Sequence, residues 1–181
     1  MEGTLELTNF PMTPGEQGVD ISIRVGALPD SRLVAQRILD NRRILCAAPA
    51  YAERMPGLAE PADLAKHPCL VLRENDSDFA LWRFEQRAGE RPGQSVKVAG
   101  PLASNDGEVI VNLALDGHGV ILRSCWDVQS HLADGRLVAL LPEWQGVRAD
   151  FHAVYRQRRH IPARIRAFVD LLRQELPGRV G

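Results

Sequence analysis

Residues 104–122 read SNDGEVIVNLALDGHGVIL and contain a helix that leads directly into a strand. Asn105 is a good N-cap, and Glu108, three residues later, can reach back to form an arrangement like a capping box. Two glycines, at 117 and 119, end the helix, and the apolar residues that follow predict a buried strand. One apolar face of the helix is formed by Val109, Ile110, Leu113 and Ala114.

Strand-like and helix-like segments alternate along the rest of the chain, which is typical of a sheet covered by helices. Ile21, Ile23 and Val25 alternate with polar residues, as in a half-buried strand. The last helix begins at Pro162 and ends at the Pro-Gly pair at 177–178. Further strands are predicted at residues 5–7, 33–38, 43–47, 69–73, 82–86, 95–99, 137–141 and 151–155, and short helices at 50–55, 61–66 and 124–134.

The composition is that of an ordinary water-soluble globular protein. About 45% of the 181 residues are hydrophobic and 25% are charged, enough to bury a core in one domain or in two small lobes. The formal net charge is -1. A protein that neutralises many phosphates carries an excess of Lys and Arg, so direct binding of this chain to nucleic acid is not expected.

The sequence offers no metal site and no export or membrane segment. Cys46, Cys69 and Cys125 are far apart, lie in or beside apolar runs and are expected to be buried, reduced thiols. The first ten residues lack the pattern of a signal peptide. No apolar run approaches the ~20 residues that span a bilayer. These features together predict a cytoplasmic protein without a metal or other cofactor.

We find no catalytic motif. The chain has no nucleophile elbow, no zinc-binding His-Glu helix, no P-loop and no dinucleotide-binding glycine pattern after a strand. Its five histidines are scattered, and no two share a helical face four residues apart. The sequence therefore predicts no catalytic residues and a protein that is not an enzyme.

The start of the helix after Ser104 is the best candidate for a binding site. The first N–H groups of a helix are unpaired and its dipole is positive there, so a carboxylate or other polar ligand can bind. If the strand at 95–99 ends at the carboxyl edge of a parallel sheet, ligands are expected at that edge. The competing interpretation is a helix cap that holds no ligand.

The chain resembles the effector-binding domain of LysR-type transcriptional regulators. Stretches similar to this family follow one another in the family's order from residue 18 to residue 170. They are GVDISIRVG (18–26), LPDSRLV (28–34), RILCAAPAY (43–51), PADL (61–64), CLVL (69–72), SNDGE (104–108), LDGHGV (115–120), GRLV (135–138), AVY (153–155), RHIP (159–162) and RAFVD (166–170).

The resemblance implies an α/β fold of two Rossmann-like lobes joined by two crossover strands, at 43–47 and 151–155, as in type 2 periplasmic binding proteins. Lobe I would comprise residues 1–46 and 154–181, and lobe II residues 47–153. A small-molecule effector, such as an organic acid, would bind in the cleft between the lobes. The cleft residues expected are Gly26, Ala27, Ser31, Ala48, Ser104, Asn105 and Asp106.

The resemblance also implies partners outside this chain. DNA would be bound only through an N-terminal winged helix-turn-helix domain, which this sequence lacks, and the protein would form a homodimer or higher oligomer without membrane contact. The first strand and helix of lobe I have no counterpart, since residues 5–7 resemble the second strand. The chain is therefore expected to be a fragment that exposes apolar surface on lobe I and self-associates through it.

Two other functions stay open at this point. A stand-alone solute receptor could share the fold without regulating transcription, although the missing export signal argues against it. An enzyme could be built on the same two-lobed scaffold, because a fold does not fix a function. No nucleophile–base pair supports that alternative.

Overall fold

The computed structural model describes residues 4–8, 13–15, 18–26, 33–73, 80–156 and 161–177. By its internal contacts the chain forms two compact units, Met1–Asn41 with Arg148–Gly181, and Arg42–Val147. We call them unit 1 and unit 2. The chain passes between them after Asn41 and again after Val147. The lobe boundaries expected from the sequence, after residues 46 and 153, fall several residues further along the chain and stay a prediction.

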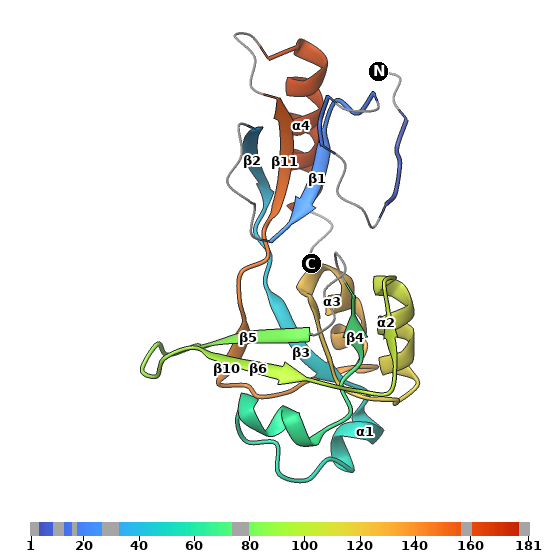
Figure 1. Cartoon of the computed structure of the whole chain (residues 1–181), viewed down its shortest axis with the longest axis vertical. Helices are drawn as coiled ribbons and strands as arrows, with labels where there is room; N and C mark the ends of the chain where they lie inside the picture. The colour runs from blue at the N-terminus through green and yellow to red at the C-terminus, as the bar shows by residue number, and fades with distance from the viewer. Residues whose placement is uncertain are drawn as a thin grey trace. The chain divides into compact units, whose positions relative to one another are not determined.

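Unit 1 is a three-stranded antiparallel sheet with one helix on its face (Figure 1). In the order of the sheet, its strands are β1 (Ser22–Val25), β11 (Phe151–Arg156) and β2 (Leu33–Leu39). The helix α4 (Ala163–Glu175) begins after Pro162, as predicted. Apolar residues of the sheet and of α4 meet in one core: Ile38, Ala153, Tyr155, Ile165 and Val169.

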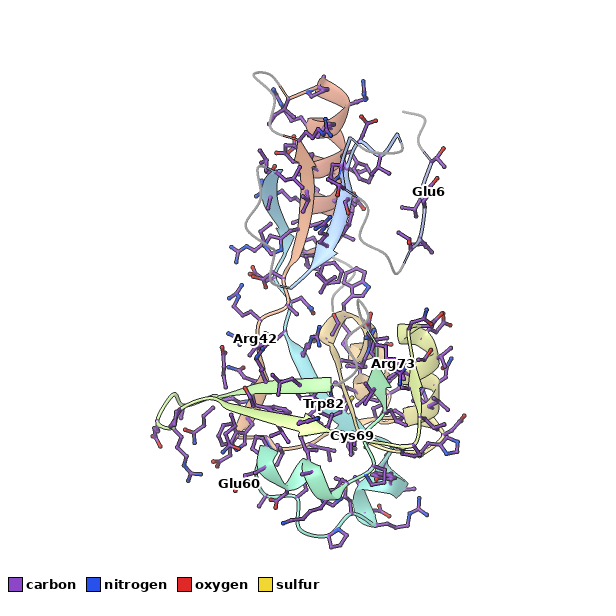
Figure 2. All side chains as sticks on the ribbon, viewed as in Figure 1. Glu6, Arg42, Glu60, Cys69, Arg73 and Trp82 are labelled. Atoms are coloured by element: carbon purple, nitrogen blue, oxygen red, sulfur yellow. The ribbon has the colours of Figure 1, made fainter. Side chains whose placement is uncertain are left out.

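The strand predicted at residues 5–7 is wrong. The backbone of residues 4–8 forms no strand, and Leu5 and Leu7 are 81% and 91% exposed. Glu6 lies on this segment, outside the sheet of unit 1 (Figure 2). A strand is stable only when a neighbouring strand takes up its N–H and C=O groups. None of the described strands pairs with this segment, so its alternating pattern produces no sheet.

Unit 2 contains two antiparallel sheets of three strands and one parallel pair. The first sheet has the order β8 (Ile121–Ser124), β3 (Arg43–Ala47), β9 (Val138–Ala139). The second has the order β10 (Trp144–Gly146), β5 (Ala80–Gln86), β6 (Gln94–Val98). The parallel pair is β4 (Val71–Leu72) with β7 (Ala103–Ser104).

The described part of unit 2 also contains four helical segments. They are α1 (Pro49–Glu53), the 3-10 helix η1 (Pro61–Lys66), α2 (Gly107–Leu115) and α3 (Cys125–Ala133). Trp82 and Cys69, both inside the unit, belong to a core that also holds Phe84 and Trp144 (Figure 2). A second core lies under α2 and α3 and includes Ile110 and Val128. The buried residues of α2 and α3 therefore lie on the side of each helix that faces this core.

The strand that precedes α2 differs from the one expected. The predicted strand at 95–99 appears as β6, but it pairs antiparallel with β5 and does not lead into the helix. The strand before α2 is the two-residue β7, which runs parallel to β4. A parallel bridge also joins Cys69 to Val120. A strand of a parallel pair therefore does lead into α2, as expected, but it is formed by residues 103–104 and not by residues 95–99.

Gly100 allows two backbone segments of unit 2 to approach each other. A Cβ atom placed on Gly100 would lie 1.8 Å from the carbonyl oxygen of Cys69. The neighbouring Ala99 accepts a hydrogen bond of 3.2 Å from the N–H of Cys69. Because the obstacle is backbone rather than a movable side chain, no rotamer change can relieve the clash.

Hydrogen bonds on Asn41 join the two chain passages. Its side-chain amide donates to the carbonyl of Ala149 at 2.9 Å, and its own carbonyl accepts from the Ala149 N–H at 2.8 Å. The Asn41 N–H donates to the carboxylate of Asp150 at 2.9 Å. On the side of unit 2, Arg43 N–H donates to Val147 at 3.4 Å. Asn41 is only 7% exposed, so these bonds are shielded from water.

A ring of alternating charges lies over the buried Asn41. Asp150 pairs with Arg148 at 2.9 Å and with Arg37 at 3.7 Å, and Asp40 also contacts both arginines. Burial raises the pKa of Asp150, but the Asn41 N–H and the two guanidinium groups outweigh it, so the pKa falls below its ordinary value of 3.8. The ionised carboxylate is therefore the form that the fold stabilises.

Replacing Gly100 by alanine is expected to destabilise unit 2. Forcing a side chain against fixed backbone costs about 1–3 kcal/mol. Gly57→Ala is the comparison, because Gly57 has a positive φ of 76° but open space around it, so its cost is limited to about 1–2 kcal/mol of backbone strain. Urea unfolding of both variants checks this, and equal midpoints for Gly100→Ala and the unmodified chain would contradict it.

Stability is expected to fall in acid through Asp150. A carboxyl whose folded pKa is lowered stabilises the fold above its unfolded pKa, and this contribution disappears as the pH drops through the folded value. The loss therefore begins near pH 3.8 and continues below it. Asp150→Asn should lower stability at pH 7 and flatten its dependence on pH below about 4. Unfolding measured from pH 7 to pH 2.5 would disprove this if both chains gave parallel curves.

Candidate functional site

Asp106, and not Asn105, is the N-cap of α2. Its backbone is extended, with φ -104° and ψ 121°, and its carboxylate accepts the N–H groups of Glu108 at 2.8 Å and Val109 at 3.2 Å. The capping box predicted between Asn105 and Glu108 is therefore wrong. An aspartate and an asparagine cap helices about equally well, so the sequence could not decide between these adjacent residues.

Ser104 is held by hydrogen bonds on both sides of β7. Its hydroxyl accepts from the N–H of Asp106 at 3.0 Å, and its carbonyl accepts from the N–H of Arg73 at 2.8 Å. These bonds fix the turn from β7 into α2. The side-chain amide of Asn105 and the backbone N–H of Gly107 form no hydrogen bond with a described residue. Both groups can therefore bind another partner.

Arg123 reaches the same helix start from β8. A Cβ atom on Gly107 would lie 2.3 Å from Nη2 of Arg123, so the guanidinium occupies the space that a side chain at 107 would fill. The Arg123 side chain is only 14% exposed and forms an ion pair with Asp127. Its Nε is buried and makes no hydrogen bond with a described residue. Sequence reasoning missed Arg123, because nothing in residues 104–108 indicates which strand lies beside them.

Opposing charges meet at this helix start, where the carboxylates of Asp106, Glu108 and Asp127 outnumber the guanidinium of Arg123. The positive end of the α2 dipole and the Arg123 guanidinium favour an anion. The carboxylates of Asp106 and Asp127 oppose it, and Asp106 already occupies two of the first N–H groups of α2. The arrangement therefore provides directed donors from Asn105, Gly107 and Arg123 rather than a strong positive field.

The other predicted cleft residues are distributed over both units. Gly26, in unit 1, has a positive φ of 83° and donates its N–H to the backbone carbonyl of Asp150 at 3.0 Å. Ala48, in unit 2, is buried and precedes α1, where its carbonyl accepts the N–H groups of Tyr51 and Ala52. Ala27 and Ser31 lie outside the described residues. The structure thus brings Ser104, Asn105 and Asp106 together with Arg123, and the wider cleft stays a prediction.

The cysteines are poor nucleophiles. Burial raises the pKa of Cys46 and of Cys69 to about 12, and it also raises the pKa of the half-buried Cys125. Among the described residues, no three His, Cys, Asp or Glu side chains are grouped so that they could hold a metal ion. Within the same part of the chain, no helix has the length and apolar character needed to cross a bilayer.

The fold described above is that of a known family of regulatory domains. The LysR substrate binding domain family matches residues 14–177, and the chain belongs to that family. Its fold is the α/β, type 2 periplasmic-binding-protein-like fold of LysR regulatory domains, as predicted. Since the match extends over nearly the whole chain, both units are parts of one effector-binding domain.

Characterised relatives are similar along most of the chain. The HTH-type transcriptional regulator DmlR of Escherichia coli K12 is 40% identical over 158 residues, which cover 87% of this chain and 50% of DmlR. The regulatory domain of CrgA, a LysR-type regulator from Neisseria meningitidis, has 32% identity and a TM-score of 0.72, covering 89% of this chain and 77% of that chain. The regulatory domain of AphB from Vibrio vulnificus has 28% identity and a TM-score of 0.66, with the same coverage.

The chain spans about half the length of the curated relatives it matches. Those relatives are HTH-type transcriptional regulators. The similarity therefore assigns this chain to the effector-binding part of such proteins.

Thiol labelling should distinguish the three cysteines. At pH 8 and in native conditions, Cys125 is expected to react slowly with Ellman's reagent, while Cys46 and Cys69 stay unreactive because a pKa of about 12 leaves almost no thiolate. Cys125→Ser should remove the native signal, and denaturant should then reveal two thiols. Fast native labelling of that variant would contradict the burial of Cys46 and Cys69.

Proposed function

We propose that this chain is the sensing part of a cytoplasmic LysR-type transcriptional regulator. The family match over residues 14–177 is the observation that carries the proposal. According to this proposal, a small-molecule effector binds between the two lobes and changes their relative angle. That change alters how an oligomer presents DNA-binding domains that lie outside this chain. The chain itself carries out no turnover and contacts DNA only through those domains.

The α2 helix start is the proposed anchor for the effector. Asn105 offers an amide that can donate or accept, Gly107 offers a backbone N–H, and Arg123 offers a guanidinium in a partly buried position. A carboxylate accepts hydrogen bonds from all three donors, and a guanidinium binds it in two-point geometry. These donors favour an organic acid over a neutral ligand. The hydroxyl of Ser104 would orient the turn, since it already accepts the Asp106 N–H.

The proposed cleft also includes residues away from this helix. Gly26 and Ala48 lack bulky side chains, so their backbone groups can approach a ligand closely. Ala27 and Ser31, which lie outside the described residues, complete the proposed set. A stand-alone solute receptor is the second candidate for the fold, but the regulators among its relatives do not favour it.

Binding measurements can test the anchor. A thermal-shift screen against small organic acids and the corresponding amides would supply a probe, and calorimetry would then give its Kd. Asn105→Ala and Ser104→Ala should each weaken binding by up to roughly tenfold, since a hydrogen bond contributes about 0.5–1.5 kcal/mol. Arg164→Ala is the control, because Arg164 lies in α4 of unit 1 and pairs with Asp20 at 3.0 Å. Equal losses in all three variants would refute the site.

Arg123→Gln should weaken the acid by roughly tenfold or more while sparing the amide, because a hydrogen bond to a charged group is worth about 1.5–3 kcal/mol. This substitution also breaks the ion pair with Asp127. Asp127→Asn is therefore the matched control, since it breaks the same pair and keeps the guanidinium. If both variants lose the acid and the amide equally, Arg123 does not contact the carboxylate.

A further inference from the structure

Asp127 is the carboxylate that pairs with Arg123 in unit 2. The two residues stand four apart, on either side of the junction between β8 and α3, and Nη2 of Arg123 donates to Oδ2 of Asp127. The backbone at this junction is fixed, because the N–H of Cys125 donates to the carbonyl of Arg42 at 2.8 Å and Val128 is fully buried. The fold therefore holds the carboxylate of Asp127 next to the guanidinium.

The pairing with Asp127 leaves the guanidinium of Arg123 only partly satisfied. A guanidinium has five N–H donors, and a carboxylate can accept two of them in parallel. The contact with Asp127 uses Nη2 alone, and Nε is buried without a hydrogen bond to a described residue. The group also lies against α2, since a Cβ on Gly107 would lie 2.3 Å from Nη2 and 3.3 Å from Nη1. Arg123 therefore keeps donors for a second carboxylate at the start of α2.

An effector has to compete with Asp127 for this guanidinium. A group attached to the same chain at short range acts at an effective concentration of about millimolar or higher. A free carboxylate without other contacts must exceed that concentration to replace Asp127. An acid that also bonds to the amide of Asn105 and the N–H of Gly107 gains roughly 2- to 10-fold in affinity from each bond, so it competes at a lower concentration.

We propose that Asp127 determines the specificity of the effector site by occupying Arg123 against simple carboxylates. Acids with one carboxylate and no other polar group are excluded, whereas acids that carry further hydrogen-bonding groups displace Asp127 or share the guanidinium with it. The inference rests on the proposed function, because it takes the start of α2 as the anchor. It narrows the ligand class from organic acids in general to acids with a second polar group.

Partial burial makes the loss of Asp127 measurable. The side chain of Arg123 is only 14% exposed, so water and salt compensate its charge poorly. Replacing Asp127 by asparagine keeps the size of the side chain and removes the negative charge, which leaves the guanidinium without its anion. The chain should lose stability, and an external carboxylate that reaches Arg123 should restore it.

Acetate is the probe, because it offers a carboxylate and no second polar group. In the full 181-residue chain at pH 7, acetate replaces chloride at constant ionic strength while thermal unfolding is followed. Asp127→Asn should unfold at a lower temperature than the unmodified chain, and acetate should raise that temperature again. The apparent Kd of acetate should be at least roughly tenfold lower in Asp127→Asn than in the unmodified chain. Equal effects of acetate on both chains, or none on either, overturn the proposal.

Three further variants separate this effect from a general effect of salt. Asp134→Asn breaks the ion pair with Arg136 beyond the end of α3, where the two side chains are 63% and 55% exposed, so acetate should not stabilise it. Asp127→Glu keeps the negative charge and should keep acetate out. Arg123→Gln added to Asp127→Asn should abolish the response, since the guanidinium is gone. Equal stabilisation of Asp134→Asn and Asp127→Asn by acetate would contradict the proposal. A variant that is unfolded in chloride should fold in acetate, and Asp127→Asn left unfolded in both counts against it.

A last variant distinguishes this inference from the proposed function. Adding Asn105→Ala to Asp127→Asn should weaken acetate binding by roughly 2- to 10-fold, since the amide of Asn105 belongs to the proposed anchor. An acetate effect that needs Arg123 but not Asn105 would refute the anchor, because the carboxylate would then bind the guanidinium elsewhere. An acid from the ligand screen that depends on Asn105, together with an acetate effect independent of Asp127, would refute the role of Asp127 alone.

Discussion

The hydrogen bonds of Asn41 are the interaction on which the architecture depends. A chain that enters unit 2 after Asn41 and leaves it after Val147 needs both passages to be fixed at the sheet of unit 1. Asn41 does this with its amide, its carbonyl and its N–H, which bond to Ala149 and Asp150. The surrounding arginine pairs are largely exposed and contribute little by themselves. Their effect is to keep the half-buried Asp150 ionised while its carboxylate accepts the Asn41 N–H.

The helix start in unit 2 combines local and distant interactions. Asp106 and Ser104 satisfy the backbone of the turn by themselves, which is the behaviour of an ordinary helix cap. Arg123 is added from β8 and lies against Gly107, where any side chain would displace it. The sequence left two interpretations of this helix start, a ligand site and a cap without a ligand. Each interpretation concerns different atoms of the same helix start. The cap uses Asp106, and the donors proposed for an effector are on Asn105, Gly107 and Arg123.

Local sequence determined the elements and the class of fold. The apolar residues of α4 recur at helical spacing, and Ile21, Ile23 and Val25 alternate, so the pattern alone placed α4 and β1. The same pattern failed at Leu5 and Leu7, because alternation shows only that a strand could form and not that a partner strand is present. It also missed β10, whose three residues are too few to show a period. Similar stretches in the family's order then identified the domain, since the match extends over residues 14–177.

Tertiary structure decided which residues meet. The sequence placed the cap of α2 at Asn105, whereas the extended backbone and the side-chain hydrogen bonds of Asp106 place it one residue later. It gave no sign that Arg123 would lie over Gly107, because that contact depends on how α2 packs against β8 in three dimensions. The order β1-β11-β2 was equally invisible, since strand order depends on which strands pair and not on any one of them. The sequence by itself thus determined most of the elements and the family, whereas long-range packing decided the composition of the helix start and the order of the strands.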